Sequence, residues 1–128
     1  IAVMPFETPE NADAALSRVV TNQTLMEFIN KGRYQVLERE QIDKILAEQG
    51  FQQSGACTSD GCLVQVGQLL GVDAMVSGVI SRLGELIVVS VRVTDVEQGR
   101  ILFATQVQTD KGIGHLLTVD LKDIAERF

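Results

Sequence analysis

The sequence has few of the residues on which metal sites and active sites commonly depend. Its 128 residues include no Trp, two Cys and one His. A structural zinc site takes four ligands, and two Cys with a single His do not make a full set. No Ser or Cys stands in a motif typical of an activated nucleophile. We therefore expect no cofactor and no catalytic residue, and the chain is not predicted to be an enzyme.

Long apolar runs and clusters of basic residues are also missing. No run approaches the roughly 20 residues of a membrane-spanning helix, and the longest, residues 86–91, contains a Ser. Seventeen acidic and eleven basic residues give a formal net charge of -6. The basic residues are scattered singly, whereas nucleic-acid binding relies on positive charge that neutralises phosphates. The sequence therefore argues against a helical membrane span and against a nucleic-acid partner.

The remaining composition is typical of one compact domain. Apolar residues make up 45% of the chain, and a chain of this length buries roughly two thirds of its extended surface on folding. No linker rich in Pro, Gly or Ser divides it. We therefore expect a single domain that spans residues 1–128.

The first half of the chain predicts two strands and three helices. Residues 1–6 form a short apolar run closed by a turn cluster, which is typical of a buried strand. Residues 34–37 predict a second strand, and helical spacing predicts helices over 12–30, 41–49 and 62–70. The apolar residues assigned to the face of the first helix are Ala12, Ala15, Leu16, Val19, Val20, Met26 and Ile29.

The second half changes to a period of two. Residues 75–82, 86–94 and 101–108 predict three strands joined by tight turns, which is typical of an antiparallel meander. A last helix is predicted over 114–128 and should lie on the sheet through one apolar stripe. The residues assigned to that stripe are Leu117, Leu121, Ile124 and Phe128.

The order β-α-β-α-α-β-β-β-α predicts an α/β (α+β) fold with a mixed sheet. The first strands are joined through helices and so can run parallel, while the last three form the meander. Helices should pack on the sheet. In outline this arrangement is similar to anticodon-binding domains.

Several segments occur here in an order that resembles one known family. They are an opening strand ending in Pro-Phe, Tyr-Gln-Val-Leu-Glu-Arg at 34–39, Gln-Ile-Asp-Lys-Ile-Leu-Ala-Glu-Gln-Gly at 41–50, Leu-Leu-Gly-Val-Asp-Ala at 69–74, Gly78, and Asp-Val-Glu-Gln-Gly at 95–99. Together they resemble the CsgG family of curli assembly and transport components, which is related to LpoB and to the N-terminal domain of TolB.

The resemblance implies a bacterial envelope protein. A CsgG-like domain is expected in the periplasm, associated with the outer membrane through a lipid on a Cys upstream of residue 1. It is expected to act in envelope assembly or secretion, through contacts with other envelope proteins or through self-association.

Two other functions stay open. Channel-forming members add long hairpins whose strands need about 9 to 11 alternating residues, and the connections here are too short to supply them, so a secretion-channel subunit would need elements outside this segment. A small-molecule or nucleotide-binding module is the other alternative, although similarity of fold alone is a weak basis for function.

The envelope resemblance also bears on Cys57 and Cys62. A short segment separates them, and envelope proteins occupy an oxidising compartment, so a disulfide is expected. Two free thiols in a cytosolic protein are the alternative.

The remaining polar residues of interest have ordinary explanations as well as functional ones. His115 is expected to face solvent or to cap the last helix. Glu38, Glu40 and Asp43 cluster at the start of a helix, where acidic residues are favoured electrostatically.

A contact surface is the one type of site that the sequence suggests. Arg39 lies among acidic neighbours, so it is expected either to tie its helix to the sheet or to face another subunit. Phe51 and Phe103, with Leu86 and Val88, are candidates for an apolar patch that meets other chains. Burial in the core is the alternative for each of these four.

Overall fold

The computed structural model describes residues 1–8, 14–48 and 60–127, and they form an α+β domain. Four strands make one sheet in the order β1-β2-β3-β4. The predicted mixed sheet with a C-terminal antiparallel meander is confirmed. The strands are β1 (Ala2–Val3), β2 (Ala74–Leu83), β3 (Leu86–Asp95) and β4 (Ile101–Thr109). The helices are α1 (Ala14–Lys31), α2 (Arg39–Glu48), α3 (Asp60–Leu70), α4 (Ile113–His115), the π-helix η2 (Leu116–Asp120) and α5 (Leu121–Arg127).

The strand at the N-terminus is interrupted at Pro5. Val3 pairs with Val76 of β2, and Glu7 pairs with Val79 in an isolated parallel bridge. The N-terminal segment thus uses one residue more than β2 between the two pairs, which is a β-bulge. Because of that extra residue, Phe6 points to the same side of the sheet as Val3, and both are buried in the same core.

The meander is specified by alternating residues and a tight turn. Ile87, Val89, Val91 and Val93 of β3 are buried, whereas Leu86, Val88, Ser90 and Arg92 between them are half-buried. Leu83 pairs with Leu86, so only Gly84 and Glu85 connect β2 to β3. Gly84 has a φ of 63°, which glycine adopts without strain.

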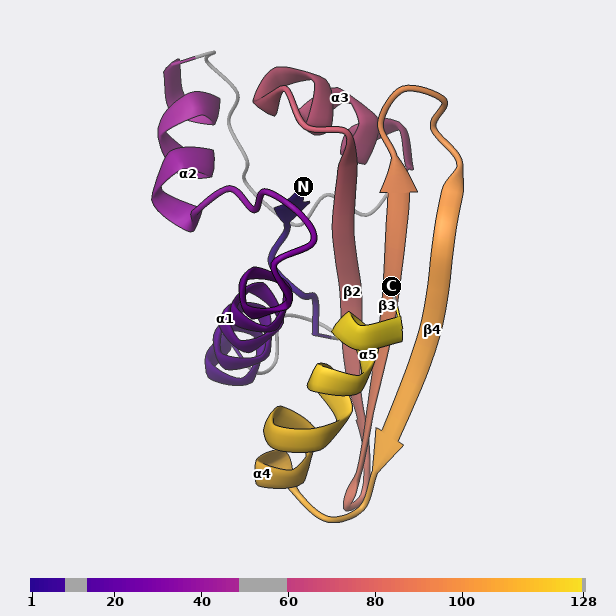
Figure 1. Ribbon diagram of the computed structural model, residues 1–128. Helices are drawn as coiled ribbons and strands as arrows, with labels where there is room; N and C mark the ends of the chain where they lie inside the picture. Colours follow the sequence, from indigo (N-terminus) through magenta and orange to yellow (C-terminus); the bar gives the residue numbers. More distant parts are fainter. Residues whose placement is uncertain (9–13, 49–59, 128) are drawn as a thin grey trace.

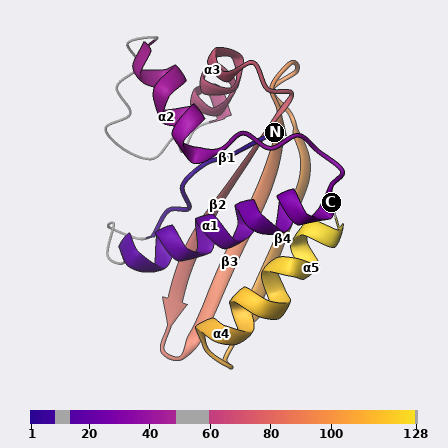
Figure 2. The same ribbon diagram turned by 60° about the vertical axis from the view of Figure 1, so that its left-hand side comes forward.

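Helices α1 and α5 lie side by side over one face of the sheet (Figure 2). The core beneath them contains Val76 and Ile80 of β2 together with the four buried residues of β3. From the helices it takes Leu16, Val20, Phe28, Leu116, Leu121, Ile124 and Ala125.

A second core lies on the opposite face, at the end of the sheet where α2 and α3 sit (Figure 1). Met75 alternates with Val76 along β2, so the two side chains point to opposite faces. Met75 is fully buried, and it belongs to a cluster with Ile42 and Leu46 of α2 and with Leu63, Val66 and Leu70 of α3.

Helix α2 begins where its sequence provides a cap. The backbone N–H of Glu38 donates to the side-chain carbonyl of Gln41 at 3.3 Å, and the N–H of Ile42 donates to the carbonyl of Glu38 at 3.1 Å. A Gln three residues after the cap position is the return contact of a capping box. This contact explains why the observed helix begins at Arg39, two residues before the predicted start at residue 41.

The predicted strand at 34–37 is wrong. Two backbone contacts do join the segment to the free side of β1: the amino group of Ile1 donates to the carbonyl of Gln35 at 2.6 Å, and the N–H of Leu37 donates to the carbonyl of Ile1 at 3.0 Å. A strand needs a ladder of such pairs, and β1 is only 2 residues long. The segment therefore covers this edge of the sheet without becoming part of it.

The predicted core face of α1 is partly wrong. Leu16 and Val20 are buried, but Val19, Met26 and Ile29 are 42%, 49% and 40% exposed. Ala15 is also exposed, and Ala12 lies outside the described residues. Thr21, Thr24 and Phe28 are buried in their place. The hydroxyls of both threonines are satisfied, because they donate to the carbonyls of Ser17 and Val20 at 2.6 and 2.8 Å.

The predicted stripe of the last helix is shifted by a π-turn. Leu116 is buried and Leu117 is only partly buried, although the regular helical spacing from Leu121 selects Leu117. In η2 each turn takes about one residue more than an α-turn. The residue beneath Leu121 is therefore five positions back, not four. Phe128, the last residue of the predicted stripe, lies outside the described residues.

Candidate functional site

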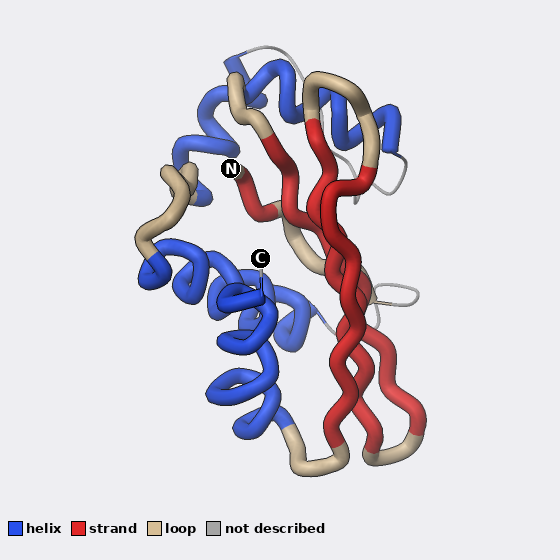
Figure 3. The backbone as a smooth tube through the Cα atoms, turned by 45° about the vertical axis from the view of Figure 1, so that its right-hand side comes forward, coloured by secondary structure: helices blue, strands red, loops and turns tan. Residues whose placement is uncertain are grey.

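The sheet leaves one large surface without a helix among the described residues. Figure 3 shows the sheet nearly edge-on, with α1 and α5 on one side and α3 at the far end of the other. Below α3, no described element lies over the outward side of β2, β3 and β4 (Figure 3). We call this surface the open face. Its residues, matched by strand register, are Val79, Ser81, Leu83, Leu86, Val88, Ser90, Arg92, Ala104, Gln106 and Gln108.

The open face mixes apolar and small polar side chains. Val79 is 42% and Leu83 is 69% exposed. The hydroxyl of Ser90 donates to the side-chain oxygen of Gln106 across β3 and β4 at 3.3 Å. A surface that combines exposed apolar side chains with small polar ones and carries no carboxylate is typical of a protein-contact surface.

The predicted patch residues do not all lie together. Leu86 and Val88 belong to the open face and are half-buried, so neither enters the core. Phe103 pairs with the buried Val93 and packs from the helix side, on the opposite face. Phe51 lies outside the described residues. The single patch that the sequence suggested is therefore not assembled by the residues described.

Arg39 occupies the first position of α2. Its Nε lies 4.0 Å from a carboxylate oxygen of Asp43, one turn along the helix, and both side chains are substantially exposed. Such a pair contributes little to stability. Its Nη1 is buried, and no described residue accepts a hydrogen bond from it. The tie to the sheet or to another subunit stays a prediction.

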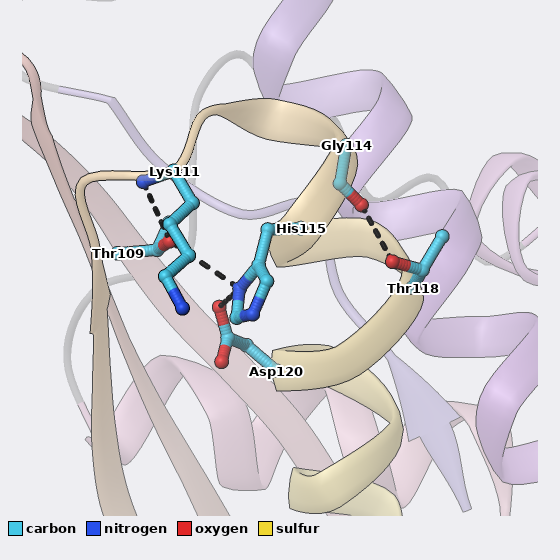
Figure 4. Close-up of polar contacts among 6 residues, drawn as sticks. All are labelled: Thr109, Lys111, Gly114, His115, Thr118 and Asp120. Carbon is cyan, nitrogen blue, oxygen red and sulfur yellow. Dashed lines mark hydrogen bonds and ion pairs between the residues drawn. The ribbon is translucent and has the colours of Figure 1, made fainter.

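His115 lies in a polar cluster between the end of β4 and the C-terminal helices (Figure 4). Its Nδ1 lies 3.2 Å from Oδ2 of Asp120 and 3.4 Å from Oγ1 of Thr109. The backbone N–H of Lys111 donates to the same Thr109 hydroxyl at 3.1 Å. The five-residue spacing of His115 and Asp120 places them on one side because the intervening turn is a π-helix.

The geometry of this cluster supports a positioning role. In a Ser-His-Asp relay the carboxylate contacts one ring nitrogen and the nucleophile contacts the other. Here Asp120 and Thr109 both approach Nδ1 of His115. The cluster therefore joins the end of β4 to the start of the C-terminal helices without the arrangement of a relay.

The disulfide prediction is not tested by the described residues. Cys62 lies in α3, and Cys57 lies outside the described part of the chain. The pairing stays a prediction.

Among the described residues, neither the acidic side chains nor the helices form a metal site or a membrane span. Within residues 1–8, 14–48 and 60–127, no group of three or more His, Cys, Asp or Glu residues could hold a metal ion. Glu40 lies in the first turn of α2, where the electrostatic explanation applies, while Glu38 precedes the helix and Asp43 lies in its second turn. None of the described helices is long and apolar enough to cross a membrane.

Sequence reasoning missed the open edge of the sheet. The order of strands places β4 at one border, with no described element beside it (Figure 1). The signal in the sequence was the lack of charge from Ile101 to Thr109, but a buried central strand has the same composition.

The fold and the open face define a small α+β domain with helices on both sides of a mixed sheet. The model of the family described as curli production assembly/transport component CsgG matches residues 3–85. This match covers more than half of the sequence, so the chain belongs to the CsgG family. A search of curated proteins found no match.

Three solved structures illustrate the similarity of fold. The LpoB C-terminal domain from Salmonella enterica is 12% identical, with a TM-score of 0.65 over 84% of this chain and 79% of that one. Lipoprotein GNA1162 from Neisseria meningitidis is 15% identical, with a TM-score of 0.70 over 98% and 90%. A PelC dodecamer from Paraburkholderia phytofirmans is 11% identical, with a TM-score of 0.57 over 96% and 82%. At these identities the likeness concerns the fold.

Proposed function

We propose that this chain is a non-enzymatic periplasmic domain of a CsgG-like outer-membrane lipoprotein, which acts in envelope assembly or secretion through protein contacts. The observation that carries the proposal is the open face. An apolar surface with exposed Val79 and Leu83 on a folded sheet favours a protein partner. Membership of the CsgG family, together with the fold shared with LpoB and a lipoprotein, supports an envelope location.

The proposal is tested in the bacterium that makes the full-length protein. A Leu83→Glu/Val79→Glu variant places two carboxylates on the open face, where both side chains are exposed and the core is undisturbed. Asn22→Glu/Asn30→Glu adds the same charge on exposed positions of α1. Cells are fractionated and treated with a cross-linker, and the protein is purified with its adducts.

We expect the protein in the envelope fraction with a specific adduct that the open-face variant loses and the α1 variant keeps. The absence of any adduct with another protein, the survival of such an adduct in the open-face variant, or a cytosolic location contradicts the proposal. So does turnover of a substrate that depends on one side chain.

A second candidate function is that of a subunit in an oligomeric outer-membrane secretion channel. Its support is the family description as a transport component and the shared fold with the PelC dodecamer. The mass of the detergent-extracted full-length protein distinguishes the two candidates. A large ring with membrane conductance supports the channel, and a soluble particle without conductance supports the contact domain.

A further inference from the structure

The sheet has two borders, and they are protected very differently. At the β1 border the strand is only 2 residues long, and Pro5 follows it. Gln35 and Leu37 occupy that side with backbone hydrogen bonds to Ile1. Short strands, Pro and covering loops are the usual ways in which proteins block a sheet edge.

Among the residues that the structure describes, the β4 border has almost none of this protection. β4 is 9 residues long, and it contains no Pro and no charged residue. A bulge near Ile101 disturbs only its first part. Alternate residues of an edge strand turn their N–H and C=O groups away from the sheet, so β4 presents a row of groups ready to pair with another strand.

The side chains along this border are also incompletely covered. Phe103 and Val107 pack against the core below α1 and α5 but stay half-buried. Ile101 and Leu102 are 45% and 48% exposed. A strand added beside β4 would extend the sheet over this apolar margin and complete the burial of Phe103 and Val107.

We propose that β4 pairs antiparallel with β4 of a second copy of this chain, which joins two sheets into one continuous sheet. Two-fold pairing uses the same open border on both copies and leaves no open β4 edge, so the assembly stops at two. Pairing with the opposite border would require displacement of the Gln35–Leu37 segment.

The residues of β4 fit this pairing. A register centred on Thr105 puts Phe103 opposite Val107 of the second copy on the helix side, and Ala104 opposite Gln106 of the second copy on the open face. No like charges meet within the ladder, because β4 has none. Arg100 and Asp110 flank β4, both exposed, and antiparallel pairing brings these opposite charges to the same ends.

The test is the mass of the chain by sedimentation equilibrium, up to a concentration of about 1 mM. We expect the wild-type protein to approach twice its 14.0 kDa mass. In an Ala104→Lys/Gln106→Lys variant the new ammonium groups face each other across the pair, which should raise the dissociation constant at least about tenfold. Ala104 and Gln106 are both exposed, so circular dichroism should show an unchanged fold.

Two matched variants complete the test. Asn22→Lys/Asn30→Lys adds the same charge on α1 and should leave the dimer intact. Ala104→Lys/Gln106→Glu puts an ammonium at position 104 opposite a carboxylate at position 106 of the second copy, and it should restore dimerisation. A wild-type protein that stays monomeric, a dimer that survives the paired lysines, or a charge-swap variant that stays monomeric overturns the proposal.

This inference stands apart from the proposed function of the open face. Failure of dimerisation would leave an adduct lost in Leu83→Glu/Val79→Glu unaffected, because that adduct depends on β2, whereas dimerisation depends on the border of β4. Loss of the envelope adduct would in turn leave the mass of the purified chain unchanged.

Discussion

The ring of Phe6 lies directly against the backbone of Gly78, in the space that a side chain at position 78 would need. A Cβ on Gly78 would lie 2.5 Å from the Phe6 ring and 2.6 Å from the backbone oxygen of Ser90. The Phe6 ring is buried in the core, and the Ser90 oxygen belongs to the inner strand β3, so neither can move aside without disturbing its neighbours. Close packing at this point therefore requires glycine.

Gly78→Ala should destabilise the domain by about 2 to 3 kcal/mol, because the added methyl overpacks the core. Chemical denaturation monitored by circular dichroism measures the change. Gly114→Ala is the control, since no atom lies within 4 Å of the Cβ that it would add. Equal stability of the Gly78→Ala and wild-type proteins would show that the Phe6 contact is looser than described.

Thr21 connects the same Phe6 to α1. The buried N–H of Phe6 donates to the Thr21 hydroxyl at 2.9 Å, and that hydroxyl donates in turn to the carbonyl of Ser17. Thr21→Val keeps the shape but leaves the Phe6 N–H without a partner, which should cost about 1 to 3 kcal/mol. Thr118→Val removes an exposed hydroxyl that donates to Gly114, and it should change the free energy of unfolding by much less. Equal losses in the two variants contradict this assignment.

The π-turn makes the effect of a deletion predictable. Removal of the exposed Thr118 would bring Leu116 to four positions before Leu121, so a regular α-helix would present the same buried leucines. We expect this variant to fold with little or no loss of stability. Deletion of Lys122 instead turns Ile124 and Ala125 away from the core, at a cost of about 2 to 5 kcal/mol.

Urea unfolding of the two deletion variants measures the difference between them. If both deletions destabilise the domain equally, the buried position of Leu116 does not arise from the π-turn.

The predicted Cys57–Cys62 disulfide can be tested by mass. Alkylation of the purified, unreduced protein should leave both Cys residues unmodified, and alkylation after reduction should modify both. So short a loop should contribute only about 2 kcal/mol to stability on the chain-entropy model. Two alkylated thiols in unreduced protein made in an oxidising compartment would disprove the pairing.

The regular part of the fold could be predicted from the sequence because burial there is one-sided. In β3 every second residue from Ile87 to Val93 is buried, and this alternation indicates both the strand and its inner face. The segment at 34–37 has the same type of residues. Whether residues 34–37 form a strand depends on the length of β1 beside them, and this length cannot be read from their own sequence.

The faces of two helices could not be predicted because more than one apolar stripe was available. In α1 the residues Val19, Met26 and Ile29 compete with a stripe that includes Thr21 and Thr24. Near the C-terminus adjacent leucines at 116 and 117 fit a π-turn and an α-turn equally well. The sheet, not the helix sequence, decides which residue is buried.

The candidate surfaces depend on strand order for the same reason. The sequence indicated Leu86 and Val88 as contact candidates, and both lie on the open face. It also grouped them with Phe103, which the register places on the opposite side. Neither the open face nor the free border of β4 can be recognised until the order of the strands in the sheet is known.

Site-specific photo-cross-linking in living cells tests the central claim, that this domain works by protein contact through its open sheet. A photoreactive residue is placed at Val88 on the open face, and separately at Lys122, an exposed position on α5. The account predicts discrete protein adducts from Val88 and none from Lys122. Adducts from Lys122 alone, or none from Val88, would contradict it.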